Sequence, residues 1–430
     1  MKQILLISPY FPPSGDVGAK RALNLVRYLR SFGWEPLVLA SPCRDLNRNT
    51  ELEQMLPENL YVSRKFGPSG RKSTLHEIKG TNTTNSLLKK LDEKGSNCTP
   101  FDQYLWYVPA ALAEGRRIVK HHNIHAIIVN ADPWSGFIVA YYLARYADIP
   151  WIADLRDPWS IHKFKMSLKP AITRYLIETF ESAFFKSAAK VILNTEFCCQ
   201  AYRDKYRTTM ESTRFTFIRN AFDMSAYKPS ESFPDTGKFS MHYFGSFRIY
   251  LDPDPLFNLI RQFITKHGLT PEDMELVLYG IQRYRDIELV KKLGLTGYIR
   301  YQDKVNQQDT LLHLKSASIL LLVEGPNRRL QLPAKLYDYL AAKRPILALS
   351  DNPELNNIID KTASGVTADF FDPENCMQKL EYLYFNRGKE YQYNAMVIRE
   401  YSVDAQVKKF STILDEVTVQ RQILKKSHLS

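Results

Sequence analysis

Two stretches of this chain are alike in pattern although about half of the chain separates them. Each is a hydrophobic strand that ends at a glycine-bearing loop and continues into an amphipathic helix. The first has its strand at residues 2–8 and its loop at 9–18, and the second has its strand at 239–244 and its loop from Gly245. A strand–loop–helix unit of this kind begins a parallel α/β domain, and the helix N-terminus beside the loop suits a phosphate. The pair of units predicts an α/β fold of two Rossmann-like lobes, whose parallel sheets face each other across a cleft.

The length and composition of the chain fit more than one globular domain. The 430 residues exceed one ordinary domain, and 44% hydrophobic residues allow each lobe to bury a core. Residues 44–100 are polar and weakly patterned, which indicates an insertion in the first lobe. Two prolines between residues 228 and 234 indicate a linker. We predict an N-terminal lobe at 1–222, a linker at 223–234, a C-terminal lobe at 235–402, and a C-terminal helix and tail at 403–430.

Apolar strands alternate with amphipathic helices along most of the chain, and this order predicts a parallel sheet in each lobe. We expect strands at 2–8, 35–40, 126–130, 150–154 and 190–194 in the first lobe, and at 240–244, 275–279, 298–301, 319–323 and 345–349 in the second. We expect helices at 20–30, 85–94, 109–121, 135–146, 170–188, 255–267, 333–342 and 403–430. In the helix at 20–30, Ala22, Leu25 and Val26 belong to the apolar stripe, and the basic residues 20, 21, 27 and 30 are expected to lie mostly off it.

The positive charge of the chain is concentrated in its first half. The formal net charge is +12, and residues 1–222 hold 31 Lys and Arg against 20 Asp and Glu, which gives +11. This excess favours an anionic partner, namely nucleic acid, anionic lipid or a phosphorylated substrate, although a solvated basic surface is an equal alternative. No zinc-ligand spacing, basic-zipper pattern or RNA-recognition motif is present, so we expect no nucleic-acid partner.

The sequence favours a cytoplasmic location. No apolar run reaches the ~18–20 residues of a membrane helix, and the N-terminus reads as a first strand rather than a signal peptide. The five cysteines are odd in number and lack CxxC spacing, which fits free thiols. We expect a protein in the cytoplasm, either free or peripheral on the inner face of the cell membrane.

Polar residues follow three of the strands expected in the first lobe, where parallel sheets bind ligands. Each group has a simpler explanation: a proline–glycine turn after the first strand, the start of a helix after the strand at 126–130, and an internal ion pair after the strand at 150–154. The candidate residues are Gly15 and Asp16 after the first strand, Asn130 and Asp132 after the third, and Arg156, Asp157 and Trp159 after the fourth.

The second lobe has a similar set of candidates. Pro333 suits the first position of a helix, and Lys335 and Asp338 are then neighbours on one helix face. They could supply a cation for a diphosphate and a carboxylate for ribose hydroxyls, or form an ordinary surface ion pair. The other candidates are Gly245 and Arg248 after the first strand of this lobe, and Glu324 and Arg328 after the strand at 319–323.

Three motifs carry a resemblance to a known family. The loop PYFPPSGDVG, the turn LRDPW and the run LPAKLYDYLAAKRPILAL together resemble the family 4 glycosyltransferases of the GT-B group, which build bacterial surface polysaccharides and glycolipids. The resemblance implies a retaining transfer of sugar from a nucleotide-diphosphate donor, with the acceptor in the N-lobe, the donor mainly in the C-lobe, and no metal required. The chain departs from the family at Arg156-Asp157, where His-Asp is common, and at Leu330, where the first Glu of a Glu-x7-Glu pattern would stand.

The resemblance gives each candidate a role. The catalytic residues would be Arg156 and Asp157; the donor-binding residues Gly15, Asp16, Gly245, Arg248, Glu324, Arg328, Lys335 and Asp338; and the acceptor-side residues Asn130, Asp132 and Trp159. The nucleotide sugar would be a substrate, with no cofactor and no metal. The expected partners are a lipid-linked or glycan acceptor and an anionic membrane surface. Two alternatives remain: a nucleotide-sugar epimerase or hydrolase of the same fold, and a non-catalytic nucleotide-sugar-binding paralogue.

Overall fold

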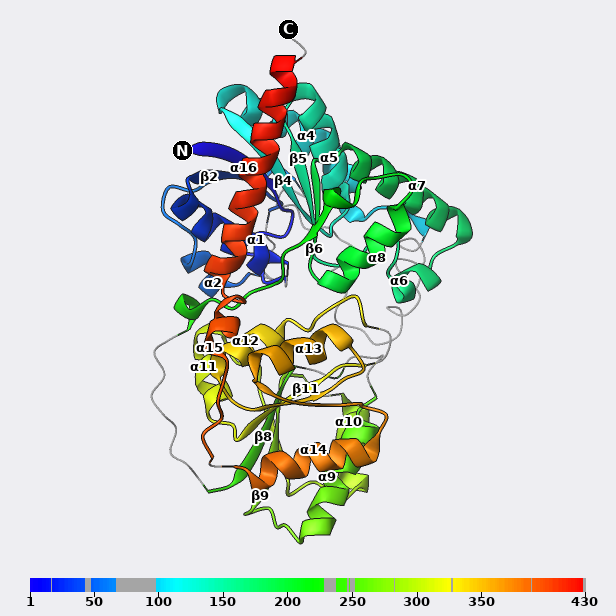
Figure 1. Cartoon of the computed structure of the whole chain (residues 1–430), viewed down its shortest axis with the longest axis vertical. Coiled ribbons are helices and arrows are strands. Elements are labelled where there is room, and N and C mark those ends of the chain that lie inside the picture. Colours follow the sequence, from blue (N-terminus) through cyan, green and yellow to red (C-terminus); the bar gives the residue numbers. More distant parts are fainter. Residues whose placement is uncertain are drawn as a thin grey trace, which may run out of the picture. The chain divides into compact units, whose positions relative to one another are not determined.

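The computed structural model describes residues 1–16, 18–42, 48–66, 98–227, 237–245, 247, 252–281, 283–325, 328–387 and 389–427. Arg248, the helix expected at 85–94, most of the expected insertion and residues 228–234 of the expected linker lie outside them. The chain forms two compact units, each built on a parallel sheet (Figure 1). Unit 1 comprises Met1–Arg219 and Gln406–Ser430, and unit 2 comprises Asn220–Ala405.

Unit 1 contains a seven-stranded parallel sheet of order β3-β2-β1-β4-β5-β6-β7. The strands are β1 (Lys2–Ile7), β2 (Trp34–Leu39), β3 (Tyr61–Ser63), β4 (Ile124–Ala131), β5 (Trp151–Leu155), β6 (Lys190–Leu193) and β7 (Phe215–Phe217). The helices are α1 (Ala19–Tyr28), α2 (Thr50–Gln54), α4 (Val108–His121), α5 (Ser135–Ala147), α6 (Lys163–Ser167), α7 (Ala171–Ser187), α8 (Glu196–Tyr206) and most of α16 (Val403–Ser427).

Unit 2 contains a six-stranded parallel sheet of order β10-β9-β8-β11-β12-β13. The strands are β8 (Phe239–Phe244), β9 (Met274–Tyr279), β10 (Ile299–Gln302), β11 (Ile319–Val323), β12 (Ile346–Leu349) and β13 (Gly365–Ala368). The helices are α9 (Asp254–His267), α10 (Tyr284–Lys292), α11 (Gln307–Lys315), α12 (Lys335–Ala342), α13 (Pro353–Thr362), α14 (Pro373–Phe385) and α15 (Ala395–Arg399).

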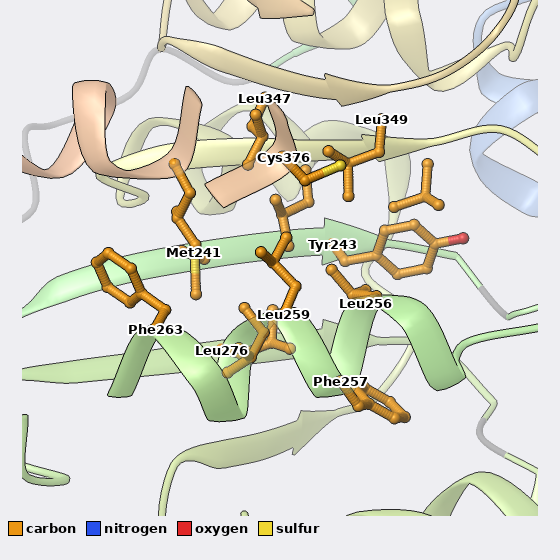
Figure 2. Packing of buried hydrophobic residues seen from close by; sticks show 14 of the residues in the cluster. Met241, Tyr243, Leu256, Phe257, Leu259, Phe263, Leu276, Leu347, Leu349 and Cys376 are labelled. Carbon is orange, nitrogen blue, oxygen red and sulfur yellow. The ribbon is translucent and has the colours of Figure 1, made fainter. Parts of the chain in front are cut away.

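The core of unit 2 lies on both faces of its sheet, as expected for a doubly wound fold. Alternate residues of β11 belong to different clusters: Leu321 packs with residues of α9 and α14, whereas Leu320 packs with residues of α11, α12 and α13. Figure 2 shows part of the first cluster, in which Met241 of β8 and Phe263 of α9 are among the buried side chains. Because successive side chains of a strand point to opposite faces, a strand of continuous apolar residues needs helices on both sides.

The ten strands expected from the sequence are all present, with bounds that move by one or two residues. Three further strands, β3, β7 and β13, were missed. Each is three or four residues long and stands at an edge of its sheet, where one side of the strand has no neighbour to bury it. Short edge strands need few apolar residues, so their hydrophobic pattern is weak.

The strand order of each sheet reverses once, between β1 and β4 in unit 1 and between β8 and β11 in unit 2. At such a switch point the loops after the two strands leave in opposite directions, and ligands of open α/β sheets bind there. Among the described residues, no helix combines the length and apolar character needed to cross a membrane.

Candidate functional site

A small pocket lies at the carboxyl end of the unit 1 sheet, at the switch point between β1 and β4. Its lining includes Tyr10 after β1, Asn130 and Asp132 at the end of β4, Arg156 after β5, and Arg21 of α1. The pocket has room for about one water-sized group. The sequence therefore brings polar side chains from three strand ends and one helix to the same place.

Arg21, which lines this pocket, belongs to a buried ion pair between α1 and β5. The Arg21 guanidinium donates two hydrogen bonds to the Asp154 carboxylate, with Nε–Oδ2 and Nη2–Oδ1 distances of 2.8 and 2.6 Å. Asp154 has no exposed surface, and Arg21 also donates to the carbonyl of Ile218 at 3.0 Å. Arg21 is the exception among the basic residues that were expected to lie mostly off the buried stripe of this helix, because Asp154 supplies the opposite charge that lets its guanidinium be buried.

Asn130 has an unused hydrogen-bond acceptor beside this ion pair. Its amide nitrogen donates to Asp154, and this contact with a carboxylate fixes which end of the amide faces the ion pair. Its Oδ1 is buried and has no hydrogen-bond partner among the described residues. Buried acceptors are normally satisfied, so Asn130 is a candidate to accept a hydrogen bond from a ligand hydroxyl or a water.

Arg156 lies over the pocket in loose ion pairs. Its Nη2 is 3.4 Å from Oδ1 of Asp132 and 3.4 Å from Oδ2 of Asp157, and Asp132 is also 3.4 Å from Nζ of Lys165. Strong pairs of this kind measure about 2.7–2.9 Å, so the guanidinium is not locked by its own carboxylates. A Cβ at Gly18 would be 2.9 Å from Nη1 of Arg156, which shows that the absence of a side chain there lets Arg156 approach the start of α1.

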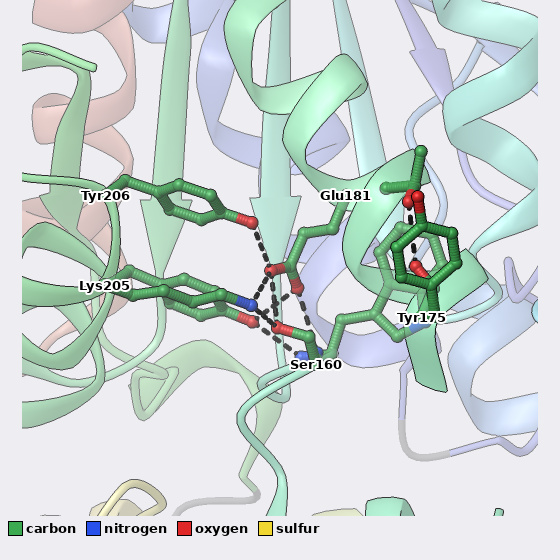
Figure 3. Close-up of polar contacts among 8 residues, drawn as sticks. Ser160, Tyr175, Glu181, Lys205 and Tyr206 are labelled. Carbon is green, nitrogen blue, oxygen red and sulfur yellow. Dashed lines mark hydrogen bonds and ion pairs between the residues drawn. The ribbon is translucent and has the colours of Figure 1, made fainter. Parts of the chain in front are cut away.

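The loop that carries Arg156 and Asp157 is anchored at its far end. Trp159 is 4% exposed and stacks on Trp134 with 4.8 Å between ring centroids, so it belongs to an aromatic cluster. Ser160 donates its backbone N–H to the fully buried Glu181 at 2.9 Å (Figure 3). Glu181 also accepts hydrogen bonds from the side chains of Ser160, Tyr202, Lys205 and Tyr206. The aromatic cluster and Glu181 therefore fix the loop while leaving Arg156 loose.

Gly15 and Asp16 form the turn that leads into α1. Gly15 is exposed, and the Asp16 carbonyl accepts the N–H of Ala19 at 2.9 Å. The N-cap of α1 is Gly18, which has no side chain to cap the first amide groups. The helix start therefore has no side-chain cap, its first amide is bonded within the turn, and no bound anion is implied.

The candidates in unit 2 lie after two neighbouring strands at the second switch point. Gly245 follows β8 and has φ +118, a conformation that favours glycine, and its N–H donates to the Tyr279 carbonyl at 3.0 Å. Glu324 follows β11 and is 4% exposed, and its Oε1 is 3.6 Å from Nη1 of Arg328. The amide of Asn352 holds this second loop by donating to the carbonyls of residues 328 and 331.

Helix α12 presents Lys335 and Asp338 to two different aromatic residues. Lys335 is the first residue of the helix, and its Nζ lies 3.7 Å from the ring centroid of Tyr243. Asp338 accepts a 2.5 Å hydrogen bond from the Tyr227 hydroxyl, and burial raises the pKa of that phenol well above its ordinary value. Pro333, expected at the first helical position, lies before the N-cap residue Ala334 instead.

The structure thus groups some candidates and separates others. It brings Asn130, Asp132, Arg156 and Asp157 together in unit 1, and it places Gly245, Glu324, Arg328, Lys335 and Asp338 on the segments after β8 and β11 of unit 2. Arg21, Asp154 and Glu181 were not singled out from the sequence. The signal that points to two of them is a charged residue inside an apolar element: Asp154 within β5, and Glu181 on the inner side of α7.

Comparison with known proteins gives a family match for part of the chain and establishes the fold of the whole. Residues 18–226 match the family model described as Glycosyltransferase Family 4. No curated protein matches the chain. Among the metal-binding side chains of the described residues, no group of three or more is placed to hold a metal ion.

Several solved structures share the fold over nearly their whole length. A glycosyltransferase from Rickettsia africae has a TM-score of 0.61 and 15% identity, over 97% of this chain and 98% of that one. Sucrose-phosphate synthase from Thermosynechococcus elongatus has a TM-score of 0.61 and 13% identity, over 100% and 99%. HepE of Anabaena, solved in complex with UDP and glucose, has a TM-score of 0.58 and 12% identity, over 99% and 100%. At these identities the likeness establishes the fold, which confirms the expected GT-B class with its two parallel sheets.

Proposed function

We propose that this chain, whose residues 18–226 match the model of glycosyltransferase family 4 and whose fold is GT-B, transfers a sugar from a nucleotide-diphosphate sugar to a lipid-linked or glycan acceptor in bacterial cell-surface glycan synthesis. The family match and the fold support a transferase. The observation that carries the proposal is the gathering of polar and charged side chains at the switch point of each sheet, the place where α/β sheets bind ligands.

The proposed reaction is a retaining transfer. The bond between the anomeric carbon and the diphosphate oxygen breaks, the diphosphate leaves with the electron pair, and an acceptor hydroxyl oxygen forms the new bond and releases its proton. The charge that develops on the diphosphate needs fixed positive groups, because such groups stabilise the transition state without rearranging. We assign this role to Lys335 and Arg328 of unit 2, and to Arg248, which lies outside the described residues.

The remaining candidates of unit 2 would orient the nucleotide. The carboxylate of Glu324 lies directly after β11 and that of Asp338 in the first turn of α12, and we assign both to hydroxyl groups of the nucleotide sugar. Gly245 provides the turn after β8, since its N–H is already bonded to Tyr279.

The candidates of unit 1 would act on the acceptor and the sugar. Arg156 and Asp157 are the proposed catalytic residues, and the loose pairing of Arg156 leaves its guanidinium able to bind a substrate. Asn130 would accept a hydrogen bond through its unused Oδ1, and Asp132 would orient Arg156. Trp159 would contribute by packing, and Gly15 and Asp16, which form the turn before α1, by binding the donor. No cofactor and no metal enters this proposal.

Nucleotide binding by the Lys335→Ala variant tests the donor assignment. We expect calorimetry with UDP, GDP and their sugars to show binding of one nucleotide, and the variant to bind it about tenfold or more weakly, because a hydrogen bond to a charged group contributes roughly 1.5–3 kcal/mol. Lys361→Ala, an exposed lysine of α13, is the matched control and should bind normally. Equal affinity of the two variants would remove Lys335 from the donor site.

Product analysis tests the reaction class. With a glycan acceptor, NMR of the product should show the anomeric configuration of the donor. Turnover of the donor without any acceptor would instead favour an epimerase or hydrolase. Nucleotide binding with no turnover on any acceptor would favour a non-catalytic binding protein.

A further inference from the structure

Strands β8 and β11 separate before they end, at the switch point of the unit 2 sheet. Their parallel register begins with Met241 beside Ile319, continues for one more residue pair, and stops short of the last residues of both strands. On their outer sides both strands stay paired to their last residues, β8 with β9 and β11 with β12. The sheet therefore opens between the two loops whose residues we assign to the donor.

A tyrosine of α12 lies where the ladder between the two strands is interrupted. The hydroxyl of Tyr339 accepts the backbone N–H of Phe244 at 3.2 Å and donates to the backbone carbonyl of Leu321 at 3.1 Å. In a parallel ladder a residue bonds to the residues before and after its partner on the next strand, so a continued register would join these same two backbone groups directly. The phenol hydroxyl thus replaces one ladder hydrogen bond with two.

The chemistry of this hydroxyl suits a lasting bridge. Tyr339 is 1% exposed, and burial raises the pKa of its phenol well above the ordinary value, so the group keeps the proton that it donates. A hydroxyl can donate one hydrogen and accept others, and backbone N–H and C=O groups inside a sheet each need a partner. The bridge therefore satisfies two backbone groups that the separation of the strands takes away from each other.

The bridge joins three segments that carry proposed donor residues. Gly245 directly follows the bonded residue of β8, and Glu324 comes three residues after the bonded residue of β11. Lys335 lies one turn before Tyr339 on the same side of α12, with its Nζ 3.7 Å from the ring centroid of Tyr243 in β8. A change at the bridge would therefore alter how the donor residues of all three segments are placed relative to one another.

We infer that Tyr339 is a positioning residue of the donor site, whose hydroxyl holds the ends of β8 and β11 and the start of α12 in the arrangement that binds the nucleotide diphosphate. Tyr339 itself is buried and touches no substrate in this assignment. The inference rests on the proposed function in one respect, since it takes the donor to bind at this switch point.

The alternative is that Tyr339 only fills the core, and a second tyrosine of α12 allows the comparison. Tyr337 is also 1% exposed and belongs to the same apolar cluster as Tyr339. It comes two residues earlier and so lies on a different side of the helix, with its ring centroid 6.4 Å from that of Tyr401. Tyr337→Phe and Tyr339→Phe each remove one buried phenol oxygen from the same helix and keep the ring.

Nucleotide calorimetry on the full chain tests the inference with these two variants. We expect Tyr339→Phe to bind UDP or GDP, whichever the wild type binds, about tenfold more weakly, because strand ends that are no longer joined must be ordered when the nucleotide binds. Tyr337→Phe should bind like the wild type. Unchanged affinity of Tyr339→Phe, or an equal loss in both variants, would overturn the inference.

Hydrogen exchange without nucleotide tests the bridge itself. The phenylalanine ring of Tyr339→Phe still separates the strands, so the N–H of Phe244 loses its partner and should exchange about tenfold or more faster, whereas Tyr337→Phe should leave it unchanged. Amides of β9 should keep their protection in both variants. Equal exchange of Phe244 in the two variants would overturn the inference, and so would a loss of protection throughout unit 2, which would show that Tyr339 supports the whole fold.

The wild-type measurement separates this inference from the proposed function. A wild-type protein that binds no nucleotide would reject the donor site and this inference with it. A wild type that binds a nucleotide no better than Tyr339→Phe does would reject the positioning role alone.

Discussion

Replacing Glu181 by glutamine removes the negative charge that anchors the loop of Arg156 and Asp157. Oε2 of Glu181 accepts the Ser160 N–H and the Tyr202 hydroxyl, both at 2.9 Å. Oε1 accepts Lys205 Nζ at 3.1 Å and the Tyr206 hydroxyl at 2.8 Å. Glutamine has one acceptor oxygen and one NH2 group. Tyrosine hydroxyls can turn to accept a hydrogen, but the Ser160 amide and the Lys205 ammonium only donate. Either orientation of the new amide therefore sets its NH2 against a donor.

The expected cost follows from these contacts. A hydrogen bond to a charged group contributes roughly 1.5–3 kcal/mol, and breaking a buried pair by removing one partner costs about 3–5 kcal/mol. We expect Glu181→Gln to lower the free energy of unfolding of unit 1 by about 3–5 kcal/mol. Guanidinium unfolding followed by tryptophan fluorescence measures this directly, because all five tryptophans, at positions 34, 106, 134, 151 and 159, belong to unit 1.

Glu178→Gln is the matched control, since Glu178 is an exposed carboxylate on the same helix α7. Surface substitutions usually change stability by no more than about 0.5 kcal/mol, and we expect that here. A Glu181→Gln midpoint that coincides with the Glu178→Gln midpoint would refute the claim that the buried carboxylate anchors the loop. Normal stability with lost transfer activity would show instead that Glu181 acts on the reaction and not on the fold.

Three further predictions concern other parts of the two units. Burial lowers the pKa of His242 to about 4, so between pH 6.5 and pH 4 the imidazole is protonated in the unfolded chain and neutral in folded unit 2. The free energy of unfolding should therefore fall by about 3 kcal/mol from pH 6.5 to pH 4. A His242→Gln variant should show a weaker pH dependence in thermal unfolding followed by circular dichroism. Gly365→Ala would set a Cβ 2.0 Å from the Ile346 carbonyl oxygen, so we expect unit 2 to lose about 3 kcal/mol or more while tryptophan-detected unfolding of unit 1 is unchanged. Gly18→Ala should cost little stability, because the tip of the flexible Arg156 side chain can move away, but it should slow transfer; full activity would argue against a role for Arg156.

Much of the fold could be predicted from the sequence because its central strands are continuous apolar runs. The run ILLLV of β11 is buried on both faces, and its continuous apolar residues predict a buried strand. The run GVTA of β13 lies at an edge of the sheet, and its residues have almost no hydrophobic pattern that would predict a strand. The positions after the strands were also predictable, since parallel strands end at one edge of the sheet.

The partners of those residues were not predictable in the same way. The contact of Asp338 with Tyr227 spans 111 positions of sequence, so the sequence near Asp338 does not indicate it. Arg21 and Asp154 are 133 positions apart, and the sequence of α1 does not indicate that a carboxylate of β5 will pair with Arg21. Local pattern predicts which face of an element is apolar; long-range pairing decides which charged residue can be buried in that face.

Unit 1 is built from two pieces of chain with the whole of unit 2 between them, and this affects the order in which a nascent chain can fold. During synthesis, residues 220–405 leave the ribosome before residues 406–430, so unit 2 has its complete sequence first. Domains fold as units, and unit 1 must then wait for the residues that place Phe410 against Arg21 and Asp415 against Lys2. A chain that ends after residue 405 would have the complete sequence of unit 2, but its N-terminal sheet would lack residues 406–430, and the apolar surface that they cover would be exposed for chaperones to bind.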